Sequence, residues 1–155
     1  MVSYSKTQHR LNMTSNETSL NELLERLLMV SSELPRQKTQ EWIDFRKKIG
    51  FTGSEISDVL GQGYMKLEGK RDLIRRKCGL RHSEFKGNEA TKWGQFYEDI
   101  AIQEYELITG RRVYPLNMLP HPVYDFLYFS PDGISVGFDE NKNVVDLRLI
   151  EVKCP

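Results

Sequence analysis

The feature that most constrains this chain is a change in the spacing of its apolar residues near residue 110. From residue 88 they recur at helical intervals, and we expect a long helix that Asn88 caps and Gly110 ends. Its apolar face would comprise Trp93, Tyr97, Ile100, Ala101, Tyr105 and Ile108. Beyond Gly110 the period becomes two, which predicts strands over 124–129, 134–138 and 144–154, with turns at 130–133 and 139–143. A long helix followed by a meander of strands predicts an α/β (α+β) fold.

The first forty residues are expected to form two parts. Residues 1–18 are polar with few large apolar side chains, so we expect a flexible polar arm. Ser19 and Glu22 then form a capping box, which begins a helix that ends near Leu34. Its apolar stripe, which we assign to core packing rather than to a partner surface, consists of Leu20, Leu23, Leu24, Leu27 and Leu28. This helix and a polar link make up residues 19–40.

Two short helices joined by a tight turn are expected next. The first would carry the apolar residues Trp42, Ile43, Phe45 and Ile49. Residues 52–54 are of the types that cap helices, and a second short helix would follow until Gly61 stops it.

The charge of the chain is balanced overall but uneven along its length. Lys plus Arg and Asp plus Glu each number 22, so a globally basic nucleic-acid binder is not indicated. Residues 66–86 nevertheless hold eight basic and three acidic side chains, whereas residues 125–151 hold two basic and six acidic ones. No apolar run is long enough to span a bilayer, and the two cysteines lack the spacing of a disulfide or zinc framework. We therefore expect no membrane partner and a reducing compartment, cytoplasmic or nuclear.

Four charged side chains stand out because they lie on otherwise apolar elements. Glu98 borders the apolar stripe of the long helix, and Asp132 lies at the end of a predicted strand. Glu151 and Lys153 follow two apart on the next strand, which places them on one side of the sheet about 6–7 Å apart. If the two strands pair, carboxylates and an ammonium converge. Such hard oxygen ligands suit Mg²⁺, with Mn²⁺ as a substitute, and a metal there would promote phosphodiester hydrolysis.

The same residues belong to a pattern of sequence blocks. Pro131-Asp132 followed by Glu151-Val152-Lys153 resembles the PD-(D/E)XK nuclease superfamily. Within it the chain resembles the lambda exonuclease and YqaJ-type viral recombinase family over residues 41–155. The blocks that carry this resemblance are W-I-D-F-R at 42–46, F-T-G-S-E-I at 51–56, G-Q-F-Y-E at 94–98, S-P-D-G-I at 130–134 and I-E-V-K-C-P at 150–155.

The resemblance implies a fold and a set of residue roles. Residues 41–155 would form a restriction-endonuclease-like core with a mixed sheet, preceded by a helical extension and truncated after the E-x-K strand. Asp132 and Glu151 would bind the metal together with Glu98, and Lys153 would be the catalytic lysine. Arg46 and Ser54 would hold a terminal phosphate of the DNA, which agrees with the bidentate geometry of a guanidinium and a hydroxyl at a helix start.

The function that follows is a metal-dependent DNA exonuclease that starts at duplex ends and serves viral or phage-type recombination or replication. Alternatives are a structure-specific or nicking endonuclease of the same superfamily and a non-catalytic DNA-binding fragment. Arg75, Arg76 and Lys77 are candidates for contacts with the DNA backbone, with a plain solvated helix as the alternative. Partners would be DNA with a free end, further copies of this chain, and a single-strand annealing protein; the chain would be virus-encoded.

Overall fold

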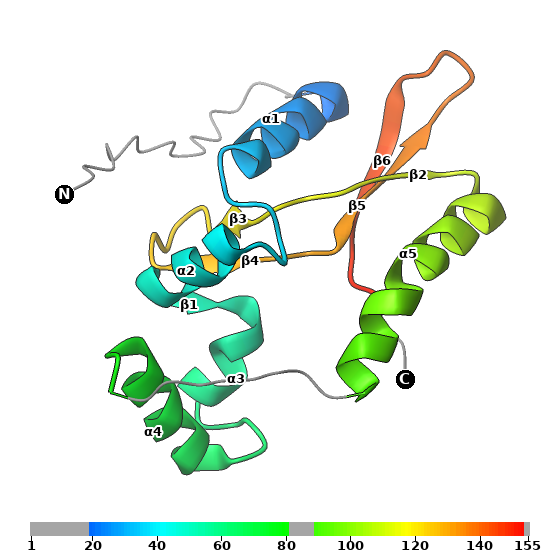
Figure 1. Ribbon diagram of the computed structural model, residues 1–155. Helices are drawn as coiled ribbons and strands as arrows, with labels where there is room; N and C mark the ends of the chain where they lie inside the picture. The colour runs from blue at the N-terminus through cyan, green and yellow to red at the C-terminus, as the bar shows by residue number, and fades with distance from the viewer. Residues whose placement is uncertain (1–18, 81–88, 154–155) are drawn as a thin grey trace.

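The computed structural model describes residues 19–80 and 89–153 (Figure 1). The predicted polar arm, the basic residues Arg81 and Lys86, the cap Asn88 and the last two residues lie outside the described residues. The helices are α1 (Leu20–Ser32), α2 (Gln40–Lys48), α3 (Ile56–Val59), α4 (Lys66–Lys77) and α5 (Glu89–Thr109), with a 3₁₀ turn at Gly53–Glu55. The strands are β1 (Phe51–Thr52), β2 (Arg112–Tyr114), β3 (Leu119–Pro120), β4 (Leu127–Phe129), β5 (Gly133–Phe138) and β6 (Val144–Ile150).

The strands form two small sheets instead of one meander. In the first, β4 pairs in parallel with β1 and antiparallel with β3. In the second, β5 lies between β2 and β6 and is antiparallel to both. The expected hairpin between residues 124–129 and 134–138 is therefore wrong. Buried Pro131 supplies no N–H for a ladder, and the chain crosses at this point from one sheet to the other.

The core lies between α1 and the second sheet. Leu24 of α1 packs with Leu116, Leu119 and the β5 residues Ile134 and Val136, and Leu27 and Leu28 lie against this cluster. The capping box of Ser19 and Glu22 begins α1 as predicted. Core packing of the leucine stripe is confirmed for these three leucines, whereas the side chains of Leu20 and Leu23 are exposed because they lie toward the outer side of the helix.

Helix α5 turns inward a face that shares Tyr97, Ala101 and Tyr105 with the predicted one but not its other three residues. Gly110, with φ of +65°, follows its end as expected. Trp93, Ile100 and Ile108 are 53%, 42% and 81% exposed, so they do not belong to the packed face. That face is formed by Tyr97, Glu98, Ala101, Ile102, Tyr105 and Glu106. Because apolar side chains surround this helix, their spacing alone does not identify one face, and Glu98 lies within the packed face rather than at its border.

Strand β6 is shorter than predicted and contains an irregularity. A register shift opposite Gly137 and Phe138 lets both Val144 and Leu147 pack on the core, so strict alternation from residue 144 is wrong. The strand ends at Ile150 because its partner β5 begins at Gly133. Glu151 and Lys153 consequently follow the strand instead of lying within it.

Candidate active site

The end of the β5–β6 hairpin brings Asp132 next to the segment that carries Glu151. Gly133 is paired with Ile150, and the Asp132 N–H donates to the Ile150 carbonyl over 3.0 Å. The Val152 N–H in turn donates to Asp132 Oδ2 over 2.6 Å. The predicted pairing of the two motifs is therefore confirmed, and it places the Asp132 carboxylate over the residues that follow β6.

The electrostatics of Asp132 link it to the other three charged residues. Burial raises the pKa of this half-buried carboxyl group; the Val152 N–H opposes that shift, while the negative charges of Glu151 and Glu98 add to it. The Lys153 ammonium lowers the pKa of Asp132. We refer to Glu98, Asp132, Glu151 and Lys153 as the carboxylate centre.

Each glutamate of the carboxylate centre is paired with a lysine. Glu151 contacts Lys153, which raises the pKa of that lysine. Glu98 accepts hydrogen bonds from Lys38, whose Nζ lies 2.9 Å from both of its carboxylate oxygens. Lys38 comes from the link between α1 and α2 and was not identified from the sequence.

The carboxylate oxygens of this centre are of the ligand type that a hard divalent cation prefers. Its three carboxylates supply oxygen ligands of the kind that Mg²⁺ prefers. Among residues 19–80 and 89–153, no three acidic, histidine or cysteine side chains are already gathered closely enough to hold a metal ion. Because Glu98 and Glu151 each contact an ammonium, a metal would have to take the place of those lysines.

A second group of polar side chains lies where β1 and β4 end. One Arg46 nitrogen, Nη2, donates to Thr52 Oγ1 over 3.1 Å and to Ser54 Oγ over 3.2 Å, and the two hydroxyl oxygens are 3.1 Å apart. Arg46 also stacks over the ring of Trp42 at 4.5 Å. The structure therefore brings together the two residues predicted to hold a terminal phosphate.

Two further charged residues hold this group in place. Glu55 Oε2 accepts hydrogen bonds from the Thr52 N–H over 2.9 Å and from its hydroxyl over 3.1 Å. Lys77 Nζ lies 3.1 Å from the same oxygen and donates to the Arg46 carbonyl over 2.9 Å. After the role predicted for Arg46 and Ser54, we refer to the cluster of Arg46, Thr52, Ser54, Glu55 and Lys77 as the phosphate pocket. Sequence reasoning missed Glu55, although the T-x-x-E spacing of a capping box was a usable signal.

The other basic candidates on α4 lie beside acidic neighbours. Arg75 donates to Glu68 over 3.3 Å, and Arg76 donates to Asp72 over 3.2 Å. Arg76 Nη1 also lies 4.0 Å from Glu55 Oε1, and Lys77 reaches toward α2. The role of Arg75, Arg76 and Lys77 in binding a DNA backbone stays a prediction.

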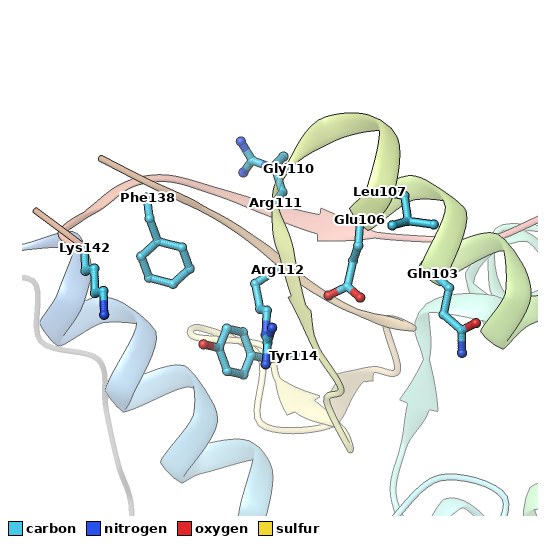
Figure 2. A pocket seen from close by; sticks show the side chains of 9 residues that line it. All are labelled: Gln103, Glu106, Leu107, Gly110, Arg111, Arg112, Tyr114, Phe138 and Lys142. Carbon is cyan, nitrogen blue, oxygen red and sulfur yellow. The ribbon is translucent and has the colours of Figure 1, made fainter. Parts of the chain in front are cut away.

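The larger of two pockets shares no lining residue with either group; Figure 2 shows its lining side chains. Its volume is about 860 Å³, and it lies between the C-terminal end of α5, strand β2 and the turn after β5. Its lining consists of Gln103, Glu106, Leu107, Gly110, Arg111, Arg112, Tyr114, Phe138 and Lys142. A smaller pocket of about 340 Å³ adjoins the carboxylate centre, between α5 and the end of β6, and Glu151 is among its lining residues. Size therefore does not locate the candidate active site in this chain.

Comparison with known proteins identifies solved structures with a similar fold. The fold is a mixed helix-and-sheet fold similar to that of an alkaline exonuclease, LHK-Exo from Laribacter hongkongensis. That match has a TM-score of 0.56 and 29% sequence identity, and it covers 76% of this chain and 54% of the other. A structure of LHK-Exo in complex with dAMP matches with the same values.

Residues 41–155 match the model of the YqaJ-like viral recombinase domain, and the chain belongs to this family. The uncharacterised protein YqaJ of Bacillus subtilis (strain 168) is 32% identical over 112 residues, which is 72% of this chain. The match covers 33% of that relative, so the chain spans about a third of its length. No helix in the described part of the chain has the length and apolar character needed to cross a membrane.

Proposed function

We propose that this chain carries the nuclease domain, residues 41–155, of a Mg²⁺-dependent DNA exonuclease that hydrolyses phosphodiester bonds from duplex ends. The observation that carries the proposal is that a short segment, residues 128–132, connects two complementary groups. Thr52 of the phosphate pocket pairs with Tyr128, and Asp132 of the carboxylate centre follows only four residues later. Four residues span at most roughly 14 Å, so one DNA end can contact both groups.

The carboxylate centre would perform the chemistry. Asp132, Glu151 and Glu98 would hold Mg²⁺, or Mn²⁺ in its place, and the metal would supply an activated water and polarise the scissile phosphate. Lys153 would release Glu151 and orient the attacking water or neutralise the developing negative charge. Asp132 is fixed for this role by the Val152 N–H, which holds one carboxylate oxygen and leaves the other available.

The phosphate pocket would select the substrate. The Arg46 guanidinium and the Ser54 hydroxyl would bind the terminal phosphate of a DNA strand, with Arg75, Arg76 and Lys77 as candidate contacts along the duplex. The alkaline exonuclease to which the chain is similar has been seen with dAMP, a mononucleotide of the kind that an exonuclease releases. We place the reaction in viral or phage-type recombination or replication, in the cytoplasm or nucleus, with an annealing protein as partner.

A comparison of DNA topologies tests the proposal. The full chain would be incubated with Mg²⁺ and either a linear duplex or a covalently closed supercoiled circle. We expect mononucleotides from the linear duplex and an intact circle. Cutting of the circle would support the endonuclease alternative, and hydrolysis of neither substrate would support a non-catalytic DNA-binding fragment; both results would contradict the exonuclease.

A further inference from the structure

The link before α2 contacts the carboxylate centre at two places, beside Asp132 and at Glu98. It precedes the part of the chain that matches the family. The Gln37 side-chain nitrogen Nε2 lies 2.9 Å from the Leu116 carbonyl, 2.7 Å from that of Asn117 and 2.8 Å from that of Pro131. Pro131 directly precedes Asp132. The next residue, Lys38, reaches Glu98 on α5. Residues 37 and 38 therefore connect the Asp132 segment to the Glu98 helix.

The contact between Lys38 and Glu98 is held by the conformation of the link. Thr39 caps α2, and its N–H and hydroxyl both donate to the Arg36 carbonyl, at 3.4 and 2.7 Å. Lys38 lies between these anchors with φ of 66°, a left-handed conformation that residues other than glycine adopt infrequently. Its side chain is 51% exposed, and that of Glu98 is 22% exposed. The ion pair is therefore open to solvent on the lysine side, from which a cation could replace the ammonium.

The charges of the centre explain what this ammonium does. The negative charges of Glu98 and Glu151 both act against ionisation of Asp132 and raise its pKa, as like charges close together do. Lys153 compensates Glu151, and Lys38 compensates Glu98. A metal ion that used Glu98 as a ligand would have to displace Lys38 from the same two oxygens.

We propose that Lys38 is a positioning residue that acts as the counter-ion of Glu98 and competes with the divalent cation for it. The inference rests on the proposed function, because it takes Glu98 to be a metal ligand. Gln37 supports it by fixing the link to the Pro131 carbonyl. Lys38 thereby lowers the affinity of the centre for metal and keeps the Glu98 side chain directed at the metal position until the cation arrives.

Metal binding, measured without any DNA, tests this competition. The full chain would be titrated with Mn²⁺, and the free ion would be followed by electron paramagnetic resonance. Lys38→Met, which keeps the length of the side chain but removes its charge, is expected to lower the Kd for Mn²⁺ about threefold to tenfold. Lys38→Arg, which keeps the charge, is expected to stay within about twofold of the wild type.

Two further variants separate the charge from the backbone. Lys38→Gly removes the ammonium, and glycine adopts the left-handed backbone without strain. It should therefore raise the Mn²⁺ affinity, and it tests the competition even if Lys38→Met folds poorly. Lys142→Met is the matched control, because Lys142 also has a positive φ, of 64°, but lies by the large pocket. Its Kd should equal that of the wild type.

The outcomes distinguish this inference from the function on which it rests. If the wild type binds Mn²⁺ and neither Lys38→Met nor Lys38→Gly binds it more tightly, the competition is refuted while the metal site stands. If both variants bind it less tightly, Lys38 only supports the fold of the site, and the inference is also refuted. If the wild type does not bind Mn²⁺, the metal site of the proposed function fails, and the inference fails with it.

Discussion

The phosphate pocket and the carboxylate centre differ in how firmly their side chains are held. In the phosphate pocket, the side chains of Glu55 and Lys77 are only 13% and 16% exposed, and each has several partners. In the carboxylate centre, Glu151 and Lys153 are 58% and 79% exposed and contact each other beyond the end of β6. The phosphate pocket is therefore preorganised, whereas Glu151 and Lys153 of the carboxylate centre form an exposed ion pair that can be exchanged for other partners.

This difference corresponds to the two tasks in the proposed reaction. A pocket that recognises a terminal phosphate benefits from donors that are already oriented, because less freedom is lost on binding. A centre that must accept a divalent cation benefits from carboxylates that exchange partners, since a rigid cluster without its cation would suffer strong repulsion. Recognition of the DNA end should therefore be separable from catalysis.

The largest effect should come from the carboxylate centre. Asp132→Asn, Glu151→Gln and Lys153→Met are each expected to reduce nuclease activity by about 10³-fold or more, because each removes a proposed metal ligand or the ammonium beside it. Release of mononucleotides from a linear duplex measures this effect. Asp125→Asn is the control, since Asp125 lies on the exposed loop before β4 and should retain activity. A folded Asp132→Asn with normal activity would remove Asp132 from the site.

A smaller effect, confined to the substrate, is expected from Arg46→Ala. Loss of the guanidinium should weaken binding of phosphorylated DNA ends about 10- to 100-fold, as for a charge-assisted hydrogen bond, and leave hydroxyl ends and Mn²⁺ affinity unchanged. Affinities for duplexes with a 5′-phosphate, a 3′-phosphate or hydroxyl ends measure it. Arg112→Ala is the control because Arg112 lines the distant large pocket. An unchanged end preference in Arg46→Ala would exclude this residue.

The hydrogen bonds and the ion pair of Glu55 in the phosphate pocket should contribute to the stability of the fold. Glu55→Gln removes the carboxylate that pairs with the largely buried Lys77, and it weakens the acceptor for the Thr52 N–H. It should therefore lower the free energy of unfolding by about 1–3 kcal/mol. Glu68→Gln is the matched control on α4: its pairs with Arg71 and Arg75 are exposed, and the loss should stay below about 0.5 kcal/mol. Equal losses in urea unfolding would refute the contrast.

The smallest effect concerns the cost of ionising Asp132. Burial raises the pKa of this group above its ordinary 3.8, so the ionised form destabilises the folded state above the folded pKa and has no effect below 3.8. Asp132→Asn should therefore be more stable than the wild type at pH 7, because it removes the cost of ionising this partly buried group. The difference should vanish as the pH falls below 3.8. A less stable Asp132→Asn at pH 7 would contradict this sign.

Local signals in the sequence predicted part of this arrangement. The capping box of α1, the glycine after α5 and the pairing of the Asp132 and Glu151 segments depend on neighbouring residues or on a single turn, and all three are confirmed. The separate sheets were missed because β1, β2 and β3 have only two or three residues and are defined by partners elsewhere in the chain. No period can be recognised in strands that short.

The candidate site shows the same division between local and distant determinants. Arg46 and Ser54 were proposed together from the resemblance, and the structure brings them together. Lys38 carried no signal, because its contact with Glu98, sixty residues away, depends on a left-handed backbone. The packed face of α5 was predicted correctly only for Tyr97, Ala101 and Tyr105, since the exact face depends on which sheet the helix meets.

Binding of DNA ends in the absence of metal tests the separation of the two groups most directly. Fluorescence anisotropy in EDTA would compare duplexes with phosphorylated ends and with hydroxyl ends for the wild type, Arg46→Ala and Asp132→Asn. We predict that the wild type and Asp132→Asn prefer a phosphorylated end about tenfold without metal, and that Arg46→Ala loses this preference. A preference that arises only when a divalent cation is added, or that Asp132→Asn abolishes, would contradict a preorganised phosphate pocket.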